Sequence, residues 1–279
     1  MERTYVLAAR PAREPAPLFV VLHGSGINGG IMASWTGLAT RGPEAGFATV
    51  FPEGREEMWD DIGLGRRDGA DDAAFISALI DQLVSEGRAL PGATVLVGLS
   101  NGAFFAERLA RHGLAGTTAV VLVAGTAREE SRRASPRPVR PTAVLCIEGS
   151  ADRLVPYTGG TATGGMAWMA RRRATRILRQ PADRAVVAAE TLASDWAATN
   201  GCTPAPSIET VTEAGEGAIR RLSWTAPGRP PVVLYRIEGG RHTWPGGPEF
   251  MPGRLAGRAA RHVDATGLLL DFARDQAVR

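Results

Sequence analysis

The sequence predicts an α/β fold with a mostly parallel central sheet and helices on both faces. Short, continuous apolar runs at 18–22, 94–97 and 119–123 are typical of strands buried on both faces. Segments with helical spacing lie between these runs, and strands that alternate with helices form parallel sheets. The length of 279 residues is ample for a sizeable core, and we expect a single domain spanning 1–279.

In the first half of the chain, strands and helices are expected to alternate. Pro11 to Pro17 form a proline-rich connection, because proline cannot sit in a sheet interior. Asp71 and Asp72 begin an amphipathic helix, and acidic residues favour a helix start. The expected elements are an edge strand at 5–8, strands at 18–22 and 48–51, a helix over about 31–45, a helix from 71–72, a strand at 94–97 and a helix to about 112.

The second half continues this alternation. Residues 127–141 are rich in arginine and proline and are expected to form a surface loop, and residues around 156–182 are a candidate small cap or pocket wall. Asn200-Gly201 is a helix stop, and Asp264 is expected to cap the last helix. The expected elements are strands at 119–123, 142–147, 218–224 and 232–237, and helices at 166–179, 184–199 and from 264.

Composition excludes several classes of protein. Hydrophobic residues make up 44% of the chain and charged residues 22%, which is ordinary for a globular protein and argues against disorder or a membrane span. Lys+Arg number 32 against 29 Asp+Glu, too small an excess for a nucleic-acid surface. Cys146 is expected on a buried strand. The start lacks a secretion signal, so the chain as written is expected in the cytoplasm, or outside if a leader was trimmed.

The segment from Thr94 to Phe105 is organised as a nucleophile elbow. An apolar strand leads into the Gly-x-Ser-x-Gly turn at 98–102, and a helix follows. In such an elbow the serine has a strained backbone, and its hydroxyl stands clear of the sheet edge. Gly98 and Gly102 would flank Ser100 because side chains there would collide with the neighbouring strand and helix. Ser100 is therefore the candidate nucleophile.

A serine hydroxyl needs a base within hydrogen-bond reach. The chain has four histidines. His112 is expected to cap a helix, His262 to lie on the surface and His23 to support the turn after a strand. His242 remains, in a glycine loop directly after a strand, and we assign it as the base.

The third member should be a carboxylate that follows another strand and falls between the serine and the histidine in sequence. Asp152 and Glu148 both come at the end of the strand that contains Cys146. We choose Asp152, because Glu148 is nearer the strand body and should point elsewhere. The alternative for Asp152 is a turn aspartate that caps local amides.

Two backbone amides are expected to form an oxyanion hole. The carboxyl ends of parallel strands meet at one sheet edge, where ligands bind. The amide of Asn101 and an amide of the 23–26 turn, for which Ser25 is favoured, would face a developing oxyanion there. The alternative is a simple glycine-rich turn. The chain lacks the Lys-Ser/Thr pair of a phosphate-binding loop.

The sequence says less about the residues that contact the substrate than about the triad. Trp59 and Trp244 could line the pocket, or they could be packing aromatics. Met166 and Trp168 follow the proposed acid, where they would form a pocket wall or pack in the core.

With these residues assembled, the chain resembles the α/β-hydrolase family, and within it the polyhydroxybutyrate depolymerase and feruloyl esterase-like branch. The motifs that carry the resemblance are Leu22-His23-Gly24, Phe51-Pro52-Glu53-Gly54 with Trp59-Asp60-Asp61, Asp71-Asp72 with Phe75-Ile76, Gly98-Leu99-Ser100-Asn101-Gly102, Ser150-Ala151-Asp152 with Val155-Pro156-Tyr157, Trp196-Ala197 with Asn200-Gly201-Cys202, and residues 239–247 around His242.

The resemblance implies a serine esterase whose nucleophile, acid and base fall on Ser100, Asp152 and His242. Many relatives have a third glycine where Arg241 stands, so its side chain would alter the pocket rim beside the base. Relatives pair the cysteine at the position of Cys202 with one between the last two strands. Here 224–231 contains none, so Cys202 is predicted to remain a thiol. Most relatives are secreted, which conflicts with the start of this chain.

The predicted reaction is two-step hydrolysis of a short-chain or aryl ester through an acyl-enzyme. The substrate would be a small or oligomeric ester, and no metal, organic cofactor, nucleic acid or membrane is expected to take part. An acyltransferase or a peptidase would use the same triad and differ in what the acyl-enzyme meets next. A non-catalytic binding protein on the same fold would lose one triad member, and all three are present here.

Overall fold

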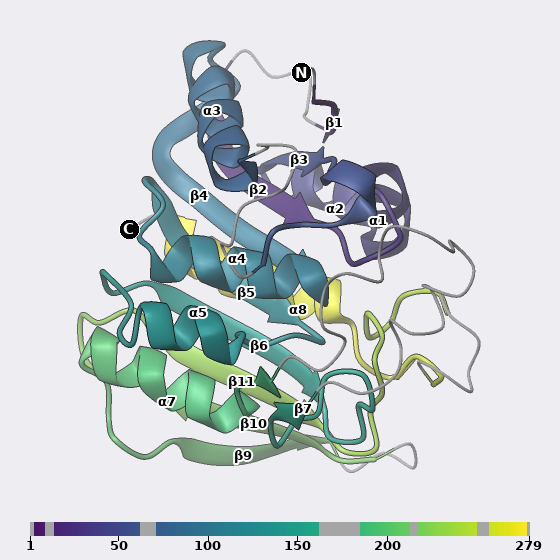
Figure 1. Ribbon diagram of the computed structural model, residues 1–279, viewed down its shortest axis with the longest axis vertical. Coiled ribbons are helices and arrows are strands. Elements are labelled where there is room, and N and C mark those ends of the chain that lie inside the picture. The colour runs from purple at the N-terminus through teal and green to yellow at the C-terminus, as the bar shows by residue number, and fades with distance from the viewer. Residues whose placement is uncertain are drawn as a thin grey trace.

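A nine-stranded sheet forms the centre of the computed structural model, which describes residues 3–8, 14–61, 71–161, 185–212, 217–249 and 257–277 (Figure 1). Its strand order is β1-β3-β2-β4-β5-β6-β11-β10-β9, and β7 and β8 pair separately. The strands are β1 Tyr5–Ala8, β2 Ala16–Leu22, β3 Ala48–Pro52, β4 Ala89–Leu99, β5 Thr117–Val123, β6 Ala143–Gly149, β7 Gly160–Thr161, β8 Ala185–Val186, β9 Ser207–Thr212, β10 Ile219–Trp224 and β11 Val232–Ile237.

The inner strands of this sheet are parallel. The five neighbouring pairs from β3 to β11 all run in the same direction, whereas β1, β10 and β9 are antiparallel to their neighbours. This arrangement confirms the predicted mostly parallel sheet. The carboxyl ends of the parallel strands share one edge, and the loops after β2, β4, β6 and β11 therefore gather there.

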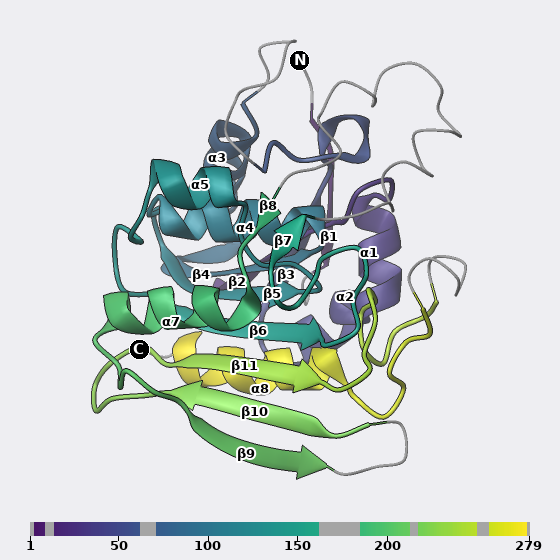
Figure 2. The ribbon, with the colours of Figure 1, turned by 60° about the horizontal axis from the view of Figure 1, so that its bottom comes forward.

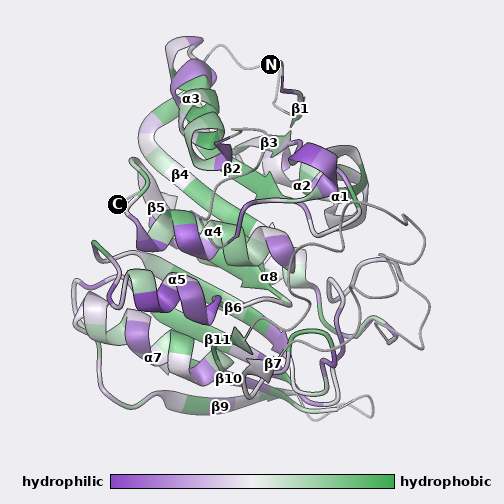
Figure 3. Ribbon diagram, viewed as in Figure 1, coloured by the Kyte–Doolittle hydropathy of each residue, from purple (hydrophilic) through white to green (hydrophobic). Residues whose placement is uncertain are grey.

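Helices cover both faces of the sheet (Figures 1 and 2). Apolar residues of α3, α4 and α7 pack on one face, and those of α1, α2 and α8 pack on the other. The hydropathy colouring shows apolar strands between helices of mixed character (Figure 3). The helices are α1 Gly29–Thr36, α2 Leu38–Glu44, the 3-10 helix η1 Arg55–Glu57, α3 Asp72–Ser85, α4 Asn101–Arg111, α5 Glu129–Ala134, α7 Ala189–Asn200 and α8 Ala265–Ala277.

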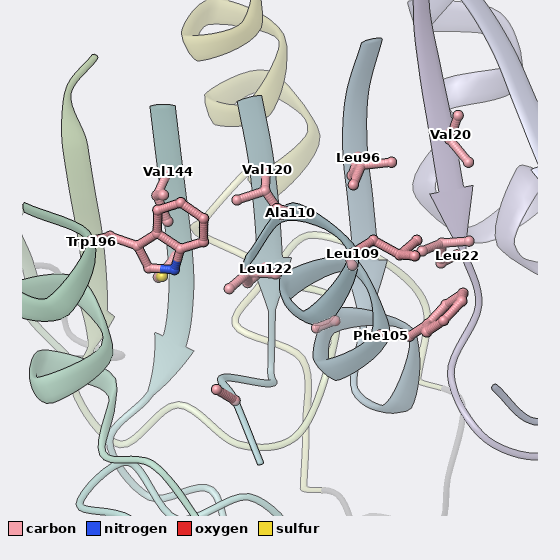
Figure 4. Packing of buried hydrophobic residues seen from close by; sticks show 14 of the residues in the cluster. Val20, Leu22, Leu96, Phe105, Leu109, Ala110, Val120, Leu122, Val144 and Trp196 are labelled. Carbon is pink, nitrogen blue, oxygen red and sulfur yellow. The ribbon is translucent and has the colours of Figure 1, made fainter. Parts of the chain in front are cut away.

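The packing under α4 and α7 fixes the position of the elbow. Phe105 and Leu109 of α4 and Trp196 of α7 point onto the sheet, where they meet strand residues such as Leu22 and Val144 (Figure 4). Each large apolar side chain that is fully buried contributes about 1.5–3 kcal/mol to the free energy of unfolding. Helix α4 is thereby packed onto β4 and its two neighbours, β2 and β5.

Several helix boundaries differ from the prediction. The expected helix over 31–45 is divided into α1 and α2 at Gly37, which has a φ of 65°. The expected loop at 127–141 contains the short helix α5, whose Ser131 is buried. Helix α7 begins at Ala189 and not near 184, because residues 185–186 form β8. The capping of α8 is as predicted, since the Asp264 carboxylate accepts from the N–H of Gly267 at 3.0 Å.

Strands β2 and β4 are longer than predicted, and β9 is additional. Strand β2 includes Pro17, which lies at the register shift between Ala16 and Leu18, where a proline costs no ladder hydrogen bond. Strand β4 starts at Ala89, ahead of the predicted run at 94–97. Strand β9 at the sheet edge was not predicted, because its residues are almost all exposed and carry no buried apolar pattern.

Other expectations concern single residues and segments. Cys146 is buried on β6, and both Cys146 and Cys202 are thiols, as predicted. Within the described residues, none of the helices has the length and apolar character that a bilayer span requires. The expected helix at 166–179 and most of the candidate cap around 156–182 lie outside the described residues.

Candidate active site

Ser100 lies at the sharp turn between β4 and α4. Its φ of 54° and ψ of −115° belong to a region that side chains rarely adopt, and such strain costs about 1–3 kcal/mol. A Cβ added to Gly98 would overlap the carbonyl oxygen of Gly102, and one added to Gly102 would overlap that of Leu22. Both flanking positions therefore require glycine, as the sequence predicted, and the turn presents Ser100 at the carboxyl edge of the sheet.

Three side chains from separate strand ends form a continuous hydrogen-bond chain. The Ser100 Oγ lies 2.9 Å from the His242 Nε2, and the His242 Nδ1 lies 2.7 Å from the Asp152 Oδ2. The three residues follow β4, β11 and β6, as the prediction required. A carboxylate only accepts hydrogen bonds, so the imidazole proton belongs on Nδ1 and Nε2 is left to accept the serine proton.

The loop after β6 fixes the orientation of Asp152. Its second oxygen, Oδ1, accepts from the backbone N–H groups of Leu154 at 2.7 Å and Val155 at 2.9 Å. Asp152 therefore caps local amides, the alternative role that the sequence left open, and it also contacts His242. Three hydrogen bonds to one buried carboxylate leave it little freedom to rotate.

The acid and histidine loops are packed against each other. Ser150 Oγ accepts from the N–H of Gly239 at 2.9 Å, and the N–H of Ala151 donates to the carbonyl of Gly240 at 3.0 Å. A Cβ on Gly149 would overlap the backbone of Gly240. This close approach of two backbones explains why glycines gather at both strand ends, and it sets the distance between Asp152 and His242.

The turn after β2 runs beside Ser100. A Cβ on Gly24 would lie 3.4 Å from the Leu99 carbonyl oxygen and 3.6 Å from the Ser100 Cβ. His23 holds this turn, since its Nδ1 donates to the Gly24 carbonyl and its Nε2 accepts from the N–H of Gly54, both at 2.8 Å. Burial lowers the pKa of His23, so the imidazole is neutral and both contacts form. This is the supporting role expected of His23.

Ser25 therefore lies in a loop that is anchored near Ser100, and Asn101 is the first residue of α4. The first N–H groups of a helix have no partner within the helix, so the Asn101 amide is available to an oxyanion. The oxyanion-hole role of the Ser25 and Asn101 amides stays a prediction.

The Asn101 side chain has a role that sequence reasoning missed. Its Oδ1 accepts from the N–H of Trp59 at 2.8 Å, and its Nδ2 donates to the Trp59 carbonyl at 3.2 Å. The Trp59 indole donates to the His23 carbonyl at 3.0 Å. The residue next to the nucleophile thus ties the elbow to the 58–61 loop and to the turn after β2. No local sequence pattern signals this link, because the residues are far apart in the chain.

The structure favours packing over pocket lining for both tryptophans. Trp59 and Trp244 are each 1% exposed. Trp59 stacks on Phe105 with ring centroids 5.2 Å apart, and the Trp244 indole donates to the Thr266 hydroxyl at 3.1 Å. Both tryptophans therefore stabilise the loops of the site by packing in the core.

The remaining predicted substrate contacts are Arg241, Met166 and Trp168. Arg241 is partly exposed beside His242, and its stem lies so close to Gly257 that a Cβ there would overlap it. A substrate contact by Arg241 stays a prediction. Met166 and Trp168 lie outside the described residues.

Several known proteins are similar to this chain. No family model matches the chain. The protein "Putative esterase NocK" of Nocardia uniformis subsp. tsuyamanensis is 29% identical over 296 residues, covering 97% of this chain and 78% of that one. Among solved structures, an acetyl xylan esterase from Aspergillus awamori superposes with a TM-score of 0.56 at 14% identity, covering 86% of this chain and 88% of that one. The chain has the α/β-hydrolase fold.

A second solved structure, a thermostable esterase, matches over 55% of this chain and 44% of its own, with 16% identity and a TM-score of 0.44. The fold assignment does not depend on this partial overlap. Ser100, Asp152 and His242 follow strand ends in this order along the chain, which is the order of the triad in the α/β-hydrolase fold. The expected class of enzyme, a serine hydrolase, agrees with the esterase name of the relative that is 29% identical.

Proposed function

We propose that this α/β-hydrolase is a carboxylesterase that hydrolyses short-chain or aryl esters through an acyl-enzyme on Ser100. The observation that carries the proposal is the hydrogen-bond chain from Ser100 through His242 to Asp152. The esterase name of the 29% identical relative supports the reaction class. The motifs that resemble the polyhydroxybutyrate depolymerase and feruloyl esterase-like branch support the same substrate class.

In the first step, His242 Nε2 accepts the Ser100 hydroxyl proton while Oγ attacks the acyl carbon. Asp152 stabilises the imidazolium that forms and keeps the ring in position. The imidazolium then gives its proton to the departing alcohol oxygen, and the acyl group remains on Oγ. In the second step, water loses a proton to His242 and attacks the acyl carbon, which releases the acid and restores the Ser100 hydroxyl.

The tetrahedral intermediates carry a negative oxygen that needs donors already in place. The amides of Ser25 and Asn101 would supply them, one from the turn after β2 and one from the start of α4. Removing one donor of an oxyanion hole typically costs about a hundredfold or more in kcat. The anchoring of both segments through His23 and the Asn101 side chain supports this assignment.

Ester hydrolysis with matched variants tests the proposal. Purified protein and Ser100→Ala are assayed on p-nitrophenyl acetate, butyrate and octanoate and on methyl ferulate. We expect hydrolysis of acetate and butyrate in preference to octanoate, and no turnover by Ser100→Ala. Equal inertness of both proteins on every ester would overturn the esterase proposal, and a preference for octanoate would overturn the short-chain substrate. Analysis of products with an added alcohol present would reveal an acyltransferase.

A further inference from the structure

Glu148 is a buried carboxyl near the triad that the proposed mechanism does not use. It is the penultimate residue of β6, in the middle of the parallel sheet, and it is 2% exposed. Its Oε1 accepts from the backbone N–H of Gly125 at 3.1 Å. A carboxyl in the centre of a core requires a reason, because burying a polar group costs free energy unless it is hydrogen-bonded.

Gly125 lies directly against the elbow. A Cβ on Gly125 would stand 2.8 Å from the carbonyl oxygen of Ser100 and 3.3 Å from the Ser100 Cα. The preceding residue, Ala124, has a φ of 48°, which a side chain rarely adopts. The loop after β5 is thus strained and touches the backbone of the nucleophile, so its position depends on the groups that hold it.

Hydrogen bonds on both sides of Gly125 hold this loop. The N–H of Ala124 donates to the Ile147 carbonyl at 3.1 Å, and the Thr126 hydroxyl donates to the Val187 carbonyl at 2.8 Å. The contact between them, at Gly125, is made by the Glu148 side chain. Glu148 is thereby the side chain that braces the loop at the point where the loop meets Ser100.

The surroundings of Glu148 favour a neutral acid. Burial raises the pKa of Glu148 well above its usual value, and the charge of Asp152 raises it further, against the lowering effect of the Gly125 N–H. The other titratable groups around it are Cys146 on the same strand, Tyr157 in the acid loop and Arg236 at the matching position of β11. A neutral Glu148 accepts the Gly125 hydrogen bond without adding a second negative charge beside Asp152.

We propose that Glu148 is a positioning residue of the nucleophile elbow, which holds Gly125 through its carboxyl oxygen and so fixes the backbone of Ser100 relative to His242. The inference rests on the proposed function, since it concerns the same nucleophile. It predicts that the acceptor oxygen matters and that the ability to ionise does not. Glutamine keeps the shape and the oxygen, whereas methionine keeps the approximate volume and removes the acceptor.

The test compares Glu148→Gln and Glu148→Met with the unaltered protein. The measurements are kcat and KM on p-nitrophenyl butyrate, the rate at which a fluorophosphonate labels Ser100, and the pH profile of kcat/KM, with circular dichroism as the check of folding. We expect Glu148→Met to lower kcat and the labelling rate about tenfold or more with little change in KM, since a small misplacement of reacting groups is costly. Glu148→Gln should retain the activity of the unaltered protein, and its kcat/KM should fall over the same range of acid pH.

Three results would overturn the inference. One is a folded Glu148→Met with unaltered kcat and labelling rate. Another is a Glu148→Gln protein as impaired as Glu148→Met, which would mean that the ionised carboxylate is required. The third is an acid limb of the pH profile that moves to lower pH by about one unit in Glu148→Gln, which would mean that Glu148 carries a negative charge in the unaltered protein. The Gln variant decides the matter even if the Met variant does not fold. The two failures can be distinguished. An inactive unaltered protein would count against the proposed function, whereas the three results above would count against the role of Glu148 alone.

Discussion

Asn101 and Trp59 are joined by two hydrogen bonds, one from the Trp59 N–H to the Asn101 Oδ1 at 2.8 Å and one from the Asn101 Nδ2 to the Trp59 carbonyl at 3.2 Å. The side-chain amide thus pairs with a backbone amide as a neighbouring strand would. The backbone N–H of Asn101 is a proposed oxyanion donor. The pair links the position of this donor to the loop that contains Trp59, and the Trp59 indole in turn holds the turn of Ser25.

Asn101→Ala should impair both stability and catalysis. The substitution removes the partner of the buried Trp59 N–H, while the Trp59 carbonyl still accepts from the N–H of Asp61 at 3.0 Å. We expect the unpaired N–H to lower the free energy of unfolding by about 1–3 kcal/mol. The elbow would also lose its link to the turn after β2. We therefore expect kcat on p-nitrophenyl acetate to fall by a larger factor than the factor by which KM rises. Urea unfolding and steady-state kinetics at a temperature where the variant is folded would measure the two effects separately.

Asn200 offers a matched control. It is also fully buried, and its amide pairs with the N–H of Thr142 at 3.0 Å and with the Thr142 carbonyl at 2.8 Å. Thr142 precedes β6, at the sheet edge opposite the triad. Asn200→Ala should cost comparable stability and leave kcat unchanged. If both variants lost kcat in proportion to stability, the link between Asn101 and catalysis would be wrong.

Asp152→Asn should preserve the fold and remove most of the activity. An asparagine amide that keeps the contacts to Leu154 and Val155 through its oxygen would present its NH₂ group to His242, and this favours the tautomer with a proton on Nε2. Such an imidazole cannot accept the Ser100 proton, and the expected loss in kcat is about 10⁴-fold. Asp264→Asn, at an exposed helix cap, is the control and should retain full activity. Activity of Asp152→Asn within tenfold of the unaltered protein would refute the assigned role.

The sequence predicted the parts of this site that depend on short segments. Ser100, Asp152 and His242 each follow an apolar strand run, and the order of those strands along the chain is enough to bring them to one edge. The contact of Asn101 with Trp59 and that of Glu148 with Gly125 join residues 42 and 23 positions apart, so no local pattern records them. Strand β9 and helix α5 were missed for a related reason, because neither shows a buried apolar face in its sequence.

Gly102→Ala should destabilise the protein strongly, because the added Cβ would overlap the Leu22 carbonyl oxygen in the backbone of a central strand. Backbone cannot move aside as a side chain can, and overpacking of this kind costs about 1–3 kcal/mol or more. Gly30→Ala is the matched control, since Gly30 lies in α1 with no atom nearer than 3.5 Å to an added Cβ. Alanine favours a helix, so this variant should be as stable as the unaltered protein or gain about 0.5–1 kcal/mol. Thermal unfolding followed by circular dichroism would compare them. Equal stability of the two variants would contradict the close approach of α4 to β2.

His23 should make the stability of the protein sensitive to mild acid. Its pKa is lowered from 6.5 by burial, so above about pH 6.5 the imidazole is neutral in the folded and the unfolded chain. Below that pH the unfolded chain takes up the proton first, and the free energy of unfolding falls by up to about 1.4 kcal/mol per pH unit until His23 in the folded protein is also protonated. Protonation would put a hydrogen on Nε2, which accepts from the N–H of Gly54, and would release the turn that carries Ser25. In His23→Gln the side-chain oxygen can still accept that hydrogen bond but cannot titrate in this range. Urea unfolding at pH 7.5, 6.0 and 5.0 should therefore show a steeper loss for the unaltered protein than for His23→Gln, and parallel losses would mean that other groups cause the acid sensitivity.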